Sequence, residues 1–115
     1  MPISSVDPLE RALRIIGGRW RLMLVYFLLY GPRRFSDLEK DVPKISQRML
    51  ALDLRRLEEA GIVSRKVLNE FPVKIEYRLT GTGLALRPIV TALYEWGEEM
   101  RDRGSELFGE ANSKS

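Results

Sequence analysis

The chain has 115 residues, 44% hydrophobic and 30% charged, with a formal net charge of +3, which suits one globular domain over residues 1–115. It has no cysteine and no histidine, so we expect no disulfide, thiol switch, metal site, cofactor, catalytic site or enzymatic activity. The longest apolar run, Leu22–Tyr30, is far shorter than the roughly 18–20 residues of a membrane span, and Met1–Asp7 lacks a signal-peptide pattern, so we expect a cytoplasmic protein without a membrane partner.

Two helices are predicted before the first Gly-Pro pair. Asp7 is the expected N-cap of the first helix, Pro8 suits its first turn, and Gly17-Gly18 ends it. Its apolar side chains recur at the spacing of an amphipathic helix, at Leu9, Ala12, Leu13 and Ile16. The second helix, Arg19–Leu29, is apolar nearly all round, which predicts a buried central helix.

A helix-turn-helix is predicted over about residues 36–60. Ser36 and Glu39 have the spacing of a capping box, and the following helix is short because Pro43 disfavours helix before it. Ser46 is a strong N-cap for a longer helix, Gln47–Ala60, which Gly61 ends. Its buried side is predicted to be Leu50, Leu54 and Leu57. A short helix and a longer one joined by a tight turn are typical of this motif.

A wing and a last helix follow. Val63–Leu68 and Val73–Leu79 have the composition and alternation of strands, with a loop at 69–72, so the wing spans about residues 62–79. Thr80 is expected to cap a helix over about residues 81–103, which Pro88 should kink or delay. The polar tail 104–115 is expected to fray. The predicted fold class is therefore mainly α with a small β-hairpin (α+β), a winged helix-turn-helix with flanking N- and C-terminal dimerisation helices.

Two features that suggest other chemistry are better explained by structure. Thr80–Gly83 resembles the start of a dinucleotide-binding turn, but Leu86 stands where the third glycine should be, so we expect a strand-to-helix turn. The adjacent acids Glu58-Glu59 and Glu98-Glu99 diverge around their helices and cannot share one site.

Positive charge gathers in the first two thirds of the chain and acids gather near its end. Six arginines and no acid lie between Arg11 and Arg34, a pattern typical of a protein that binds a polyanion. With its leucines buried, the second helix of the helix-turn-helix would turn a DNA-reading set outward: Ser46, Gln47, Arg48, Ala51, Leu52 and Arg55. Residues predicted to contact the DNA backbone or to act from the wing are Arg34, Ser36, Lys44, Arg56, Arg65, Lys66, Asn69 and Lys74.

Structural explanations stay open for parts of this set. Arg55-Arg56 with Glu58-Glu59 could form ordinary surface ion pairs, and Arg65-Lys66 could be the hydrated face of an edge strand. The alternative function is a winged-helix protein–protein interaction module, since fold alone does not fix function. A mainly polar and basic outward face disfavours that alternative.

Several stretches together resemble the HxlR-type family of winged helix-turn-helix regulators. They run in family order over roughly residues 8–98: Ile16–Trp20, Gly31–Leu38, Ile45–Leu50, Leu54–Val63, Glu76–Thr80 with Gly83, and Leu93–Gly97. The resemblance implies a bacterial or archaeal transcription factor with the helix from Ser46 in the major groove of double-stranded DNA. It also implies effectors in some members. Members that sense electrophiles use a cysteine near the N-terminus, which this chain lacks, so only a non-covalent small-molecule effector stays open.

The resemblance further implies a homodimer formed through the N- and C-terminal helices. A small core with two flanking helices also leaves more apolar side chains than it can bury. The predicted dimer surface is Leu9, Leu13, Ile16, Leu93, Tyr94, Trp96 and Met100.

Overall fold

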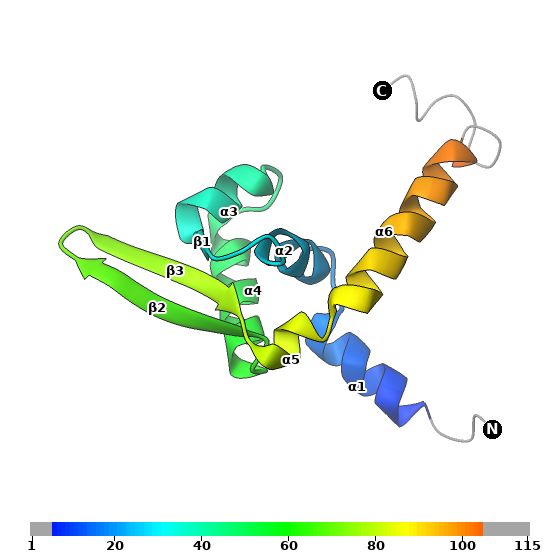
Figure 1. Cartoon of the computed structure of the whole chain (residues 1–115), viewed down its shortest axis with the longest axis horizontal. Coiled ribbons are helices and arrows are strands. Elements are labelled where there is room, and N and C mark those ends of the chain that lie inside the picture. Colours follow the sequence, from blue (N-terminus) through cyan, green and yellow to red (C-terminus); the bar gives the residue numbers. More distant parts are fainter. Residues whose placement is uncertain (1–5, 105–115) are drawn as a thin grey trace.

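The computed structural model describes residues 6–104 as helices packed around a small sheet (Figure 1). In chain order the elements are α1 (Asp7–Ile16), α2 (Arg21–Leu28), β1 (Arg33–Arg34), α3 (Phe35–Asp41), α4 (Gln47–Glu59), β2 (Val63–Glu70), β3 (Val73–Leu79), α5 (Gly81–Leu84) and α6 (Arg87–Asp102). The predicted fold class, a mainly helical winged helix-turn-helix, is confirmed. The prediction for the tail falls on residues 105–115, which lie outside the described residues.

The core lies where α2, α3 and α4 meet the inner face of the sheet. Its most completely buried large side chains are Leu24, Val25, Leu38, Leu50, Leu54, Leu57 and Val63. The three leucines predicted for the buried side of α4 are among them. The helix α2 is buried on one side only, since Met23 is exposed, so the prediction of a helix buried all round was too strong.

The sheet has three antiparallel strands in the order β1-β3-β2, one more than predicted. The additional strand pairs Arg33 with Tyr77 and Arg34 with Glu76. The strand β3 has its predicted bounds, whereas β2 continues to Glu70 and leaves only a two-residue turn at the tip of the hairpin. Asn69, predicted in a loop, is therefore a strand residue opposite Lys74.

The helix ends follow local signals in most places. The Ser46 hydroxyl accepts a hydrogen bond from the Met49 N–H at 3.0 Å, as an N-cap does, and Gly61 ends α4 with a φ of 77°. Pro88 lies in the first turn of α6, so the predicted last helix begins late, after the separate short α5.

Two predicted caps are displaced. The helix α1 begins at Asp7 itself, with Val6 as the N-cap. The helix α3 begins at Phe35 rather than after Ser36, and the Asp37 carboxylate accepts a hydrogen bond from the Arg34 N–H at 3.0 Å. The β1–β3 pairing explains this shift, because it holds Arg34 extended and makes that residue the N-cap.

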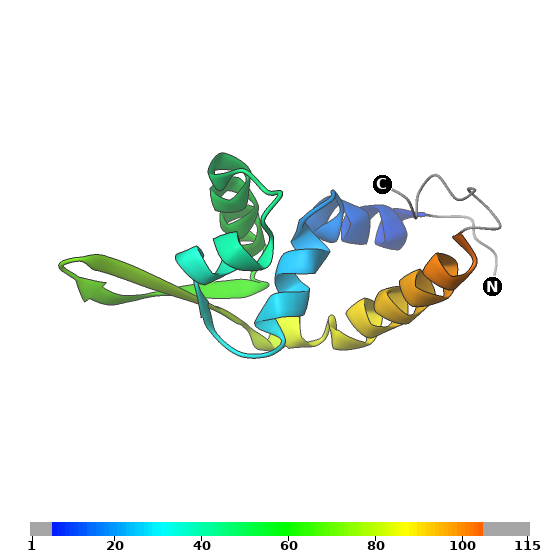
Figure 2. The same cartoon turned by 90° about the horizontal axis from the view of Figure 1, so that it is seen from above.

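The elements are spread over a flat molecule of 53 × 44 × 23 Å. The β2–β3 hairpin extends to one side of the core, and α1 and α6 extend from the opposite side (Figure 1). Seen from above, α2 lies between these two regions, and α3 and α4 lie over the base of the hairpin (Figure 2). Among residues 6–104, no helix is long and apolar enough to cross a bilayer.

Candidate nucleic-acid interface

The solvent-facing side of α4 carries the side chains predicted to read bases. Gln47, Arg48, Ala51, Leu52 and Arg55 are all exposed. Arg48, Leu52 and Arg55 lie opposite the buried leucine side of the helix, because residues are spaced about 100° apart around a helix. The structure thus places a polar and basic strip along α4, starting at its capped N-terminus.

The cations of this strip are not neutralised by neighbouring acids. Within the described residues, Arg48 and Arg55 form no ion pair. This holds for Arg55 even though Glu58 and Glu59 follow it by one turn of the helix. Arg56 is different, because its guanidinium lies 3.6 Å from the Glu59 carboxylate. The surface-pair explanation therefore holds for Arg56 and not for Arg55.

The basic residues of the wing lie on two different faces of the hairpin. Arg65 is opposite Tyr77 and shares the inner face, which packs toward α4. Lys66 is opposite Glu76 on the outer face, where Lys74 and Asn69 also lie, because side chains alternate along a strand and directly paired residues share a face. The structure does not bring all four together.

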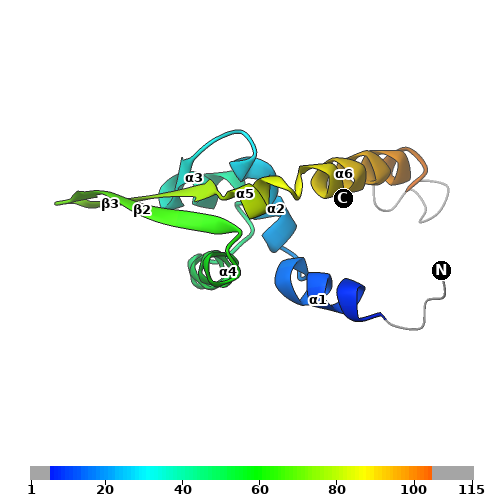
Figure 3. The same cartoon turned by 60° about the horizontal axis from the view of Figure 1, so that its bottom comes forward.

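A hollow of about 350 Å³ lies between α4 and the inner face of the wing, lined by Ala51, Arg55, Glu58, Arg65 and Tyr77. It joins Arg55 of the helix to Arg65 of the hairpin, two residues that were predicted separately. Viewed along α4, the helix lies below the β2–β3 ribbon (Figure 3). The side of α4 that carries Ala51 and Arg55 and the inner face of the wing therefore form one concave, mainly basic surface.

The remaining predicted backbone contacts lie beside α3. Arg34 and Ser36 are exposed at its start, and Lys44 is exposed in the turn that leads to α4. Arg34 pairs with Glu76 from one side and Lys66 pairs with it from the other, so all three side chains share the outer face of the sheet. These side chains flank the concave surface rather than lining it.

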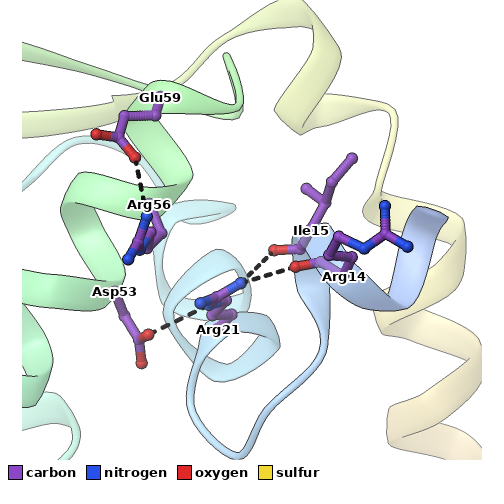
Figure 4. Close-up of polar contacts among 6 residues, drawn as sticks. All are labelled: Arg14, Ile15, Arg21, Asp53, Arg56 and Glu59. Carbon is purple, nitrogen blue, oxygen red and sulfur yellow. Dashed lines mark hydrogen bonds and ion pairs between the residues drawn. The ribbon is translucent and has the colours of Figure 1, made fainter. Parts of the chain in front are cut away.

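Arg21 joins α1 to α4, a connection that the sequence patterns did not predict (Figure 4). Its Nε donates to Asp53 Oδ1 at 3.2 Å, and its Nη1 donates to the carbonyl oxygens of Arg14 and Ile15 at 3.1 and 3.0 Å. These carbonyls belong to the last turn of α1, where helices leave acceptors unsatisfied. One guanidinium thus fixes the end of α1 against α4.

Asp53 itself carried a signal that was overlooked. It follows Leu50 by three residues and precedes Leu57 by four, so it lies on the buried side of α4. Its side chain is only 8% exposed. A buried carboxylate requires a cation or hydrogen-bond donors nearby, and the arginine-rich segment before it was the evident source.

The side chains predicted for a dimer surface are mostly exposed in the single chain. Leu9 and Leu13 on α1 and Leu93 and Trp96 on α6 are at least 48% exposed, and Met100 is half-buried. Ile89, also exposed, extends the α6 set at helical spacing and was not predicted.

Two members of the predicted dimer surface have partners within the chain. Ile16 is 8% exposed, so the single chain already buries most of it and leaves little of its surface for a second subunit. Tyr94 stacks on Tyr26, with ring centroids 5.6 Å apart and the ring planes 9° from parallel. Half of its surface is still exposed.

Comparison with known proteins agrees with this architecture. Residues 15–105 match the model of the HxlR-like helix-turn-helix family. The HTH-type transcriptional regulator YdeP of Bacillus subtilis (strain 168) is 45% identical over 100 residues, which cover 87% of this chain and 78% of YdeP. The redox regulator HypR in its reduced form superposes with a TM-score of 0.78 at 47% identity, over 83% of this chain and 94% of HypR. The HTH-type regulator YtcD superposes with a TM-score of 0.80 at 36% identity, over 90% of this chain and all of the YtcD chain.

Proposed function

Because the chain belongs to the HxlR-like helix-turn-helix family, whose members compared above are transcriptional regulators, we propose that it binds a specific double-stranded DNA sequence as a homodimer. It is a transcriptional regulator and not an enzyme. We also propose that it acts in the cytoplasm, where the DNA of a bacterial or archaeal cell lies. The observation that carries the proposal is the exposed side of α4, whose Arg48 and Arg55 have no acidic partner among the described residues.

The proposed contacts divide by chemistry. Gln47 and Arg48 read base edges, because an amide and a guanidinium form bidentate hydrogen bonds with adenine and guanine. Ala51 and Leu52 contact thymine methyl groups. Arg55 and Arg65, which line the same hollow, hold the phosphate backbone where it passes between helix and wing.

The predicted residues that do not line the concave surface are proposed to contact the DNA backbone around it. Lys66, Asn69 and Lys74 reach phosphates from the outer face of the hairpin, while Arg34, Ser36 and Lys44 do so from the start of α3 and the turn before α4. Ser46 acts through its N-cap hydrogen bond, which fixes the first turn of α4. Arg56 contributes less, because Glu59 already neutralises part of its charge.

We propose that the chain dimerises through α1 and α6, which gives the DNA-binding dimer two-fold symmetry. Two copies of α4 would enter successive major grooves about 34–36 Å apart and read a two-fold symmetric site. The exposed apolar residues on α1 and α6 favour this arrangement, since an unpartnered surface of this kind is costly in water.

The proposed effector chemistry does not involve a cysteine. HypR is a redox regulator, but this chain contains no cysteine, so a thiol switch of its own is excluded. We propose a non-covalent small molecule for any such role.

Selection of bound duplexes from a random DNA library at near-physiological salt tests the proposal. Enrichment of a two-fold symmetric sequence is the expected result, and the spacing of its halves gives the dimer geometry. Affinity for the selected site should fall steeply as salt is raised, because bound phosphates release counterions. Negligible binding to every duplex would overturn the proposal and favour a protein-docking module instead.

A further inference from the structure

A second hollow, of about 390 Å³, lies between α2 and α6 on the far side of the core from the wing. Its volume is within the range of roughly 300–1,000 Å³ that small-molecule sites occupy. Three tyrosine rings and three charged side chains contribute to its lining: Tyr26, Tyr30, Tyr94, Arg87, Glu95 and Glu98. Nothing in the DNA-binding function requires this combination.

The three tyrosines form a connected aromatic cluster. Tyr26 stacks on Tyr94, and Tyr30 meets Tyr26 edge-on with centroids 5.5 Å apart. The hydroxyls of Tyr26 and Tyr30 are 3.2 Å apart. This hydrogen bond, followed by burial, raises the pKa of Tyr26 to about 12. The cluster presents aromatic rings with electron-rich faces to the hollow.

The charges around the hollow are separated along α6. Glu95 and Glu98 are three residues apart and share one side of the helix, and neither forms an ion pair or hydrogen bond with any residue from 6 to 104. Glu99, by contrast, lies 3.8 Å from Arg103. Arg87 lies eight residues before Glu95, roughly 12 Å away along the helix axis. One end of the hollow thus has two unpaired carboxylates beside aromatic rings.

We propose that this hollow is a binding site for a small planar aromatic cation. The flat body of the ligand lies against the tyrosine cluster, and its positive charge lies toward Glu95 and Glu98. Ring faces attract cations, and aromatic cages recognise organic ammonium groups in this way. The two carboxylates add the charge complement that a neutral or anionic aromatic ligand could not use.

The charged side of the hollow faces away from the apolar side of α6. On a helical wheel, the side of α6 that carries Thr91, Glu95 and Glu98 is about 160° from the side that carries Leu93 and Trp96. A partner that covers Leu93 and Trp96 therefore leaves both carboxylates accessible, although Tyr94, which was predicted for the dimer surface, also lines the hollow. The inference does not depend on DNA binding, because ligand binding is measured on the protein alone.

Isothermal titration calorimetry of the full chain with the N-methylquinolinium cation tests the inference. Naphthalene-2-sulfonate is the matched probe, since it has a similar bicyclic ring system and the opposite charge. The cation should bind once per chain and at least about tenfold more tightly than the anion. The double variant Glu95→Gln, Glu98→Gln should lose about tenfold in affinity for the cation, whereas Glu99→Gln, with a change of the same kind on the same helix, should not.

A second variant guards against a folding defect in the first. Tyr30 is the most exposed ring of the cluster, so Tyr30→Ala removes an aromatic wall with little loss of packing and should also weaken the cation. Three outcomes would overturn the inference: no heat of binding at millimolar cation, equal binding of the anion, or equal affinities in the double variant and in Glu99→Gln.

Discussion

At the scale of single residues, the contact between Arg21 and Asp53 makes a prediction about stability. The Asp53 carboxylate is nearly buried, and Arg21 is its only partner among the described residues. Arg21→Met should lower the free energy of unfolding by about 2–3 kcal/mol, because it leaves a buried charge unpaired and removes the donor to the end of α1. Urea denaturation followed by circular dichroism measures this.

A double variant separates the two parts of that loss. Arg21→Met with Asp53→Leu removes the charge pair together and should recover most of the stability. The free energy of unfolding that the double variant does not recover measures the lost hydrogen bonds to the carbonyl oxygens of Arg14 and Ile15, because both variants remove their donor. If Arg21→Met alone stays within about 0.5 kcal/mol of the parent chain, the contact has no structural weight.

The hydroxyl pair of Tyr26 and Tyr30 makes a prediction about pH. The pKa of Tyr26 is raised to about 12, so folding favours the protonated phenol over the phenolate. The stabilisation is complete below pH 10, the ordinary pKa, and is lost as the pH rises from 10 through 12. Titration of phenolate absorbance should reveal one late-ionising tyrosine, and Tyr30→Phe should bring its pKa back toward 10. An unchanged titration curve in that variant would contradict the assigned cause.

At the scale of elements, loss of a cation from α4 and loss of one from the wing should change DNA binding in different ways. Arg48→Ala should cost roughly 1–3 kcal/mol on the selected DNA site and relax its specificity, because Arg48 is proposed to read a base. Lys74→Ala should weaken binding to all sequences alike and reduce the salt slope by about one, because it is proposed to contact phosphate. Fluorescence anisotropy over a salt series on specific and random duplexes measures both. Identical behaviour of the two variants would refute the division of roles.

The junction of the wing with α5 depends on a close approach of two backbones. A methyl group on Gly83 would clash with the Ile62 carbonyl oxygen, whereas one on Gly81 would meet nothing within 4 Å. Gly83→Ala should therefore destabilise the fold by about 1–3 kcal/mol, and Gly81→Ala should stay within about 0.5 kcal/mol of the parent. Thermal unfolding of the two variants checks the contrast. Equal melting temperatures would show that the junction can shift to admit a methyl group.

The same elements show what sequence patterns can predict. The bounds of α4 and β3 follow from local signals, namely the Ser46 cap, Gly61 and strict alternation from Val73. The strand β1 has two residues and no pattern of its own, and it exists only because β3 lies beside it. The separation of Arg65 from Lys66, and its pairing with Arg55 across the hollow, likewise depend on register and on packing of the sheet against α4. Local sequence encodes the parts, while contacts distant in sequence decide which side chains meet.

At the scale of the whole molecule, the two sites proposed for the chain lie on different elements. The DNA-binding surface is on α4 and the wing, and the aromatic hollow is between α2 and α6. The wing extends from one side of the core, and α1 and α6 extend from the opposite side (Figure 1). Between them, Arg21 ties α1 to α4, and α2 contacts both α4 and α6. A shift of α1 or α6 would therefore reach α4, the helix proposed to read DNA, through packed and hydrogen-bonded contacts rather than through a flexible linker.

This arrangement makes the dimer testable by one substitution and its control. Trp96 is 60% exposed on the apolar side of α6, so Trp96→Glu should leave the fold of the single chain intact and place a charge in the proposed interface. Analytical ultracentrifugation at micromolar concentration should show a dimer for the parent chain and a monomer for this variant. Thr91→Glu, on the opposite side of the same helix, should remain dimeric. Because a monomer engages only one half-site, Trp96→Glu should also lose most of its affinity for the symmetric sequence. A parent chain that sediments as a monomer would refute the dimer, whereas a dimeric Trp96→Glu variant would place the interface elsewhere.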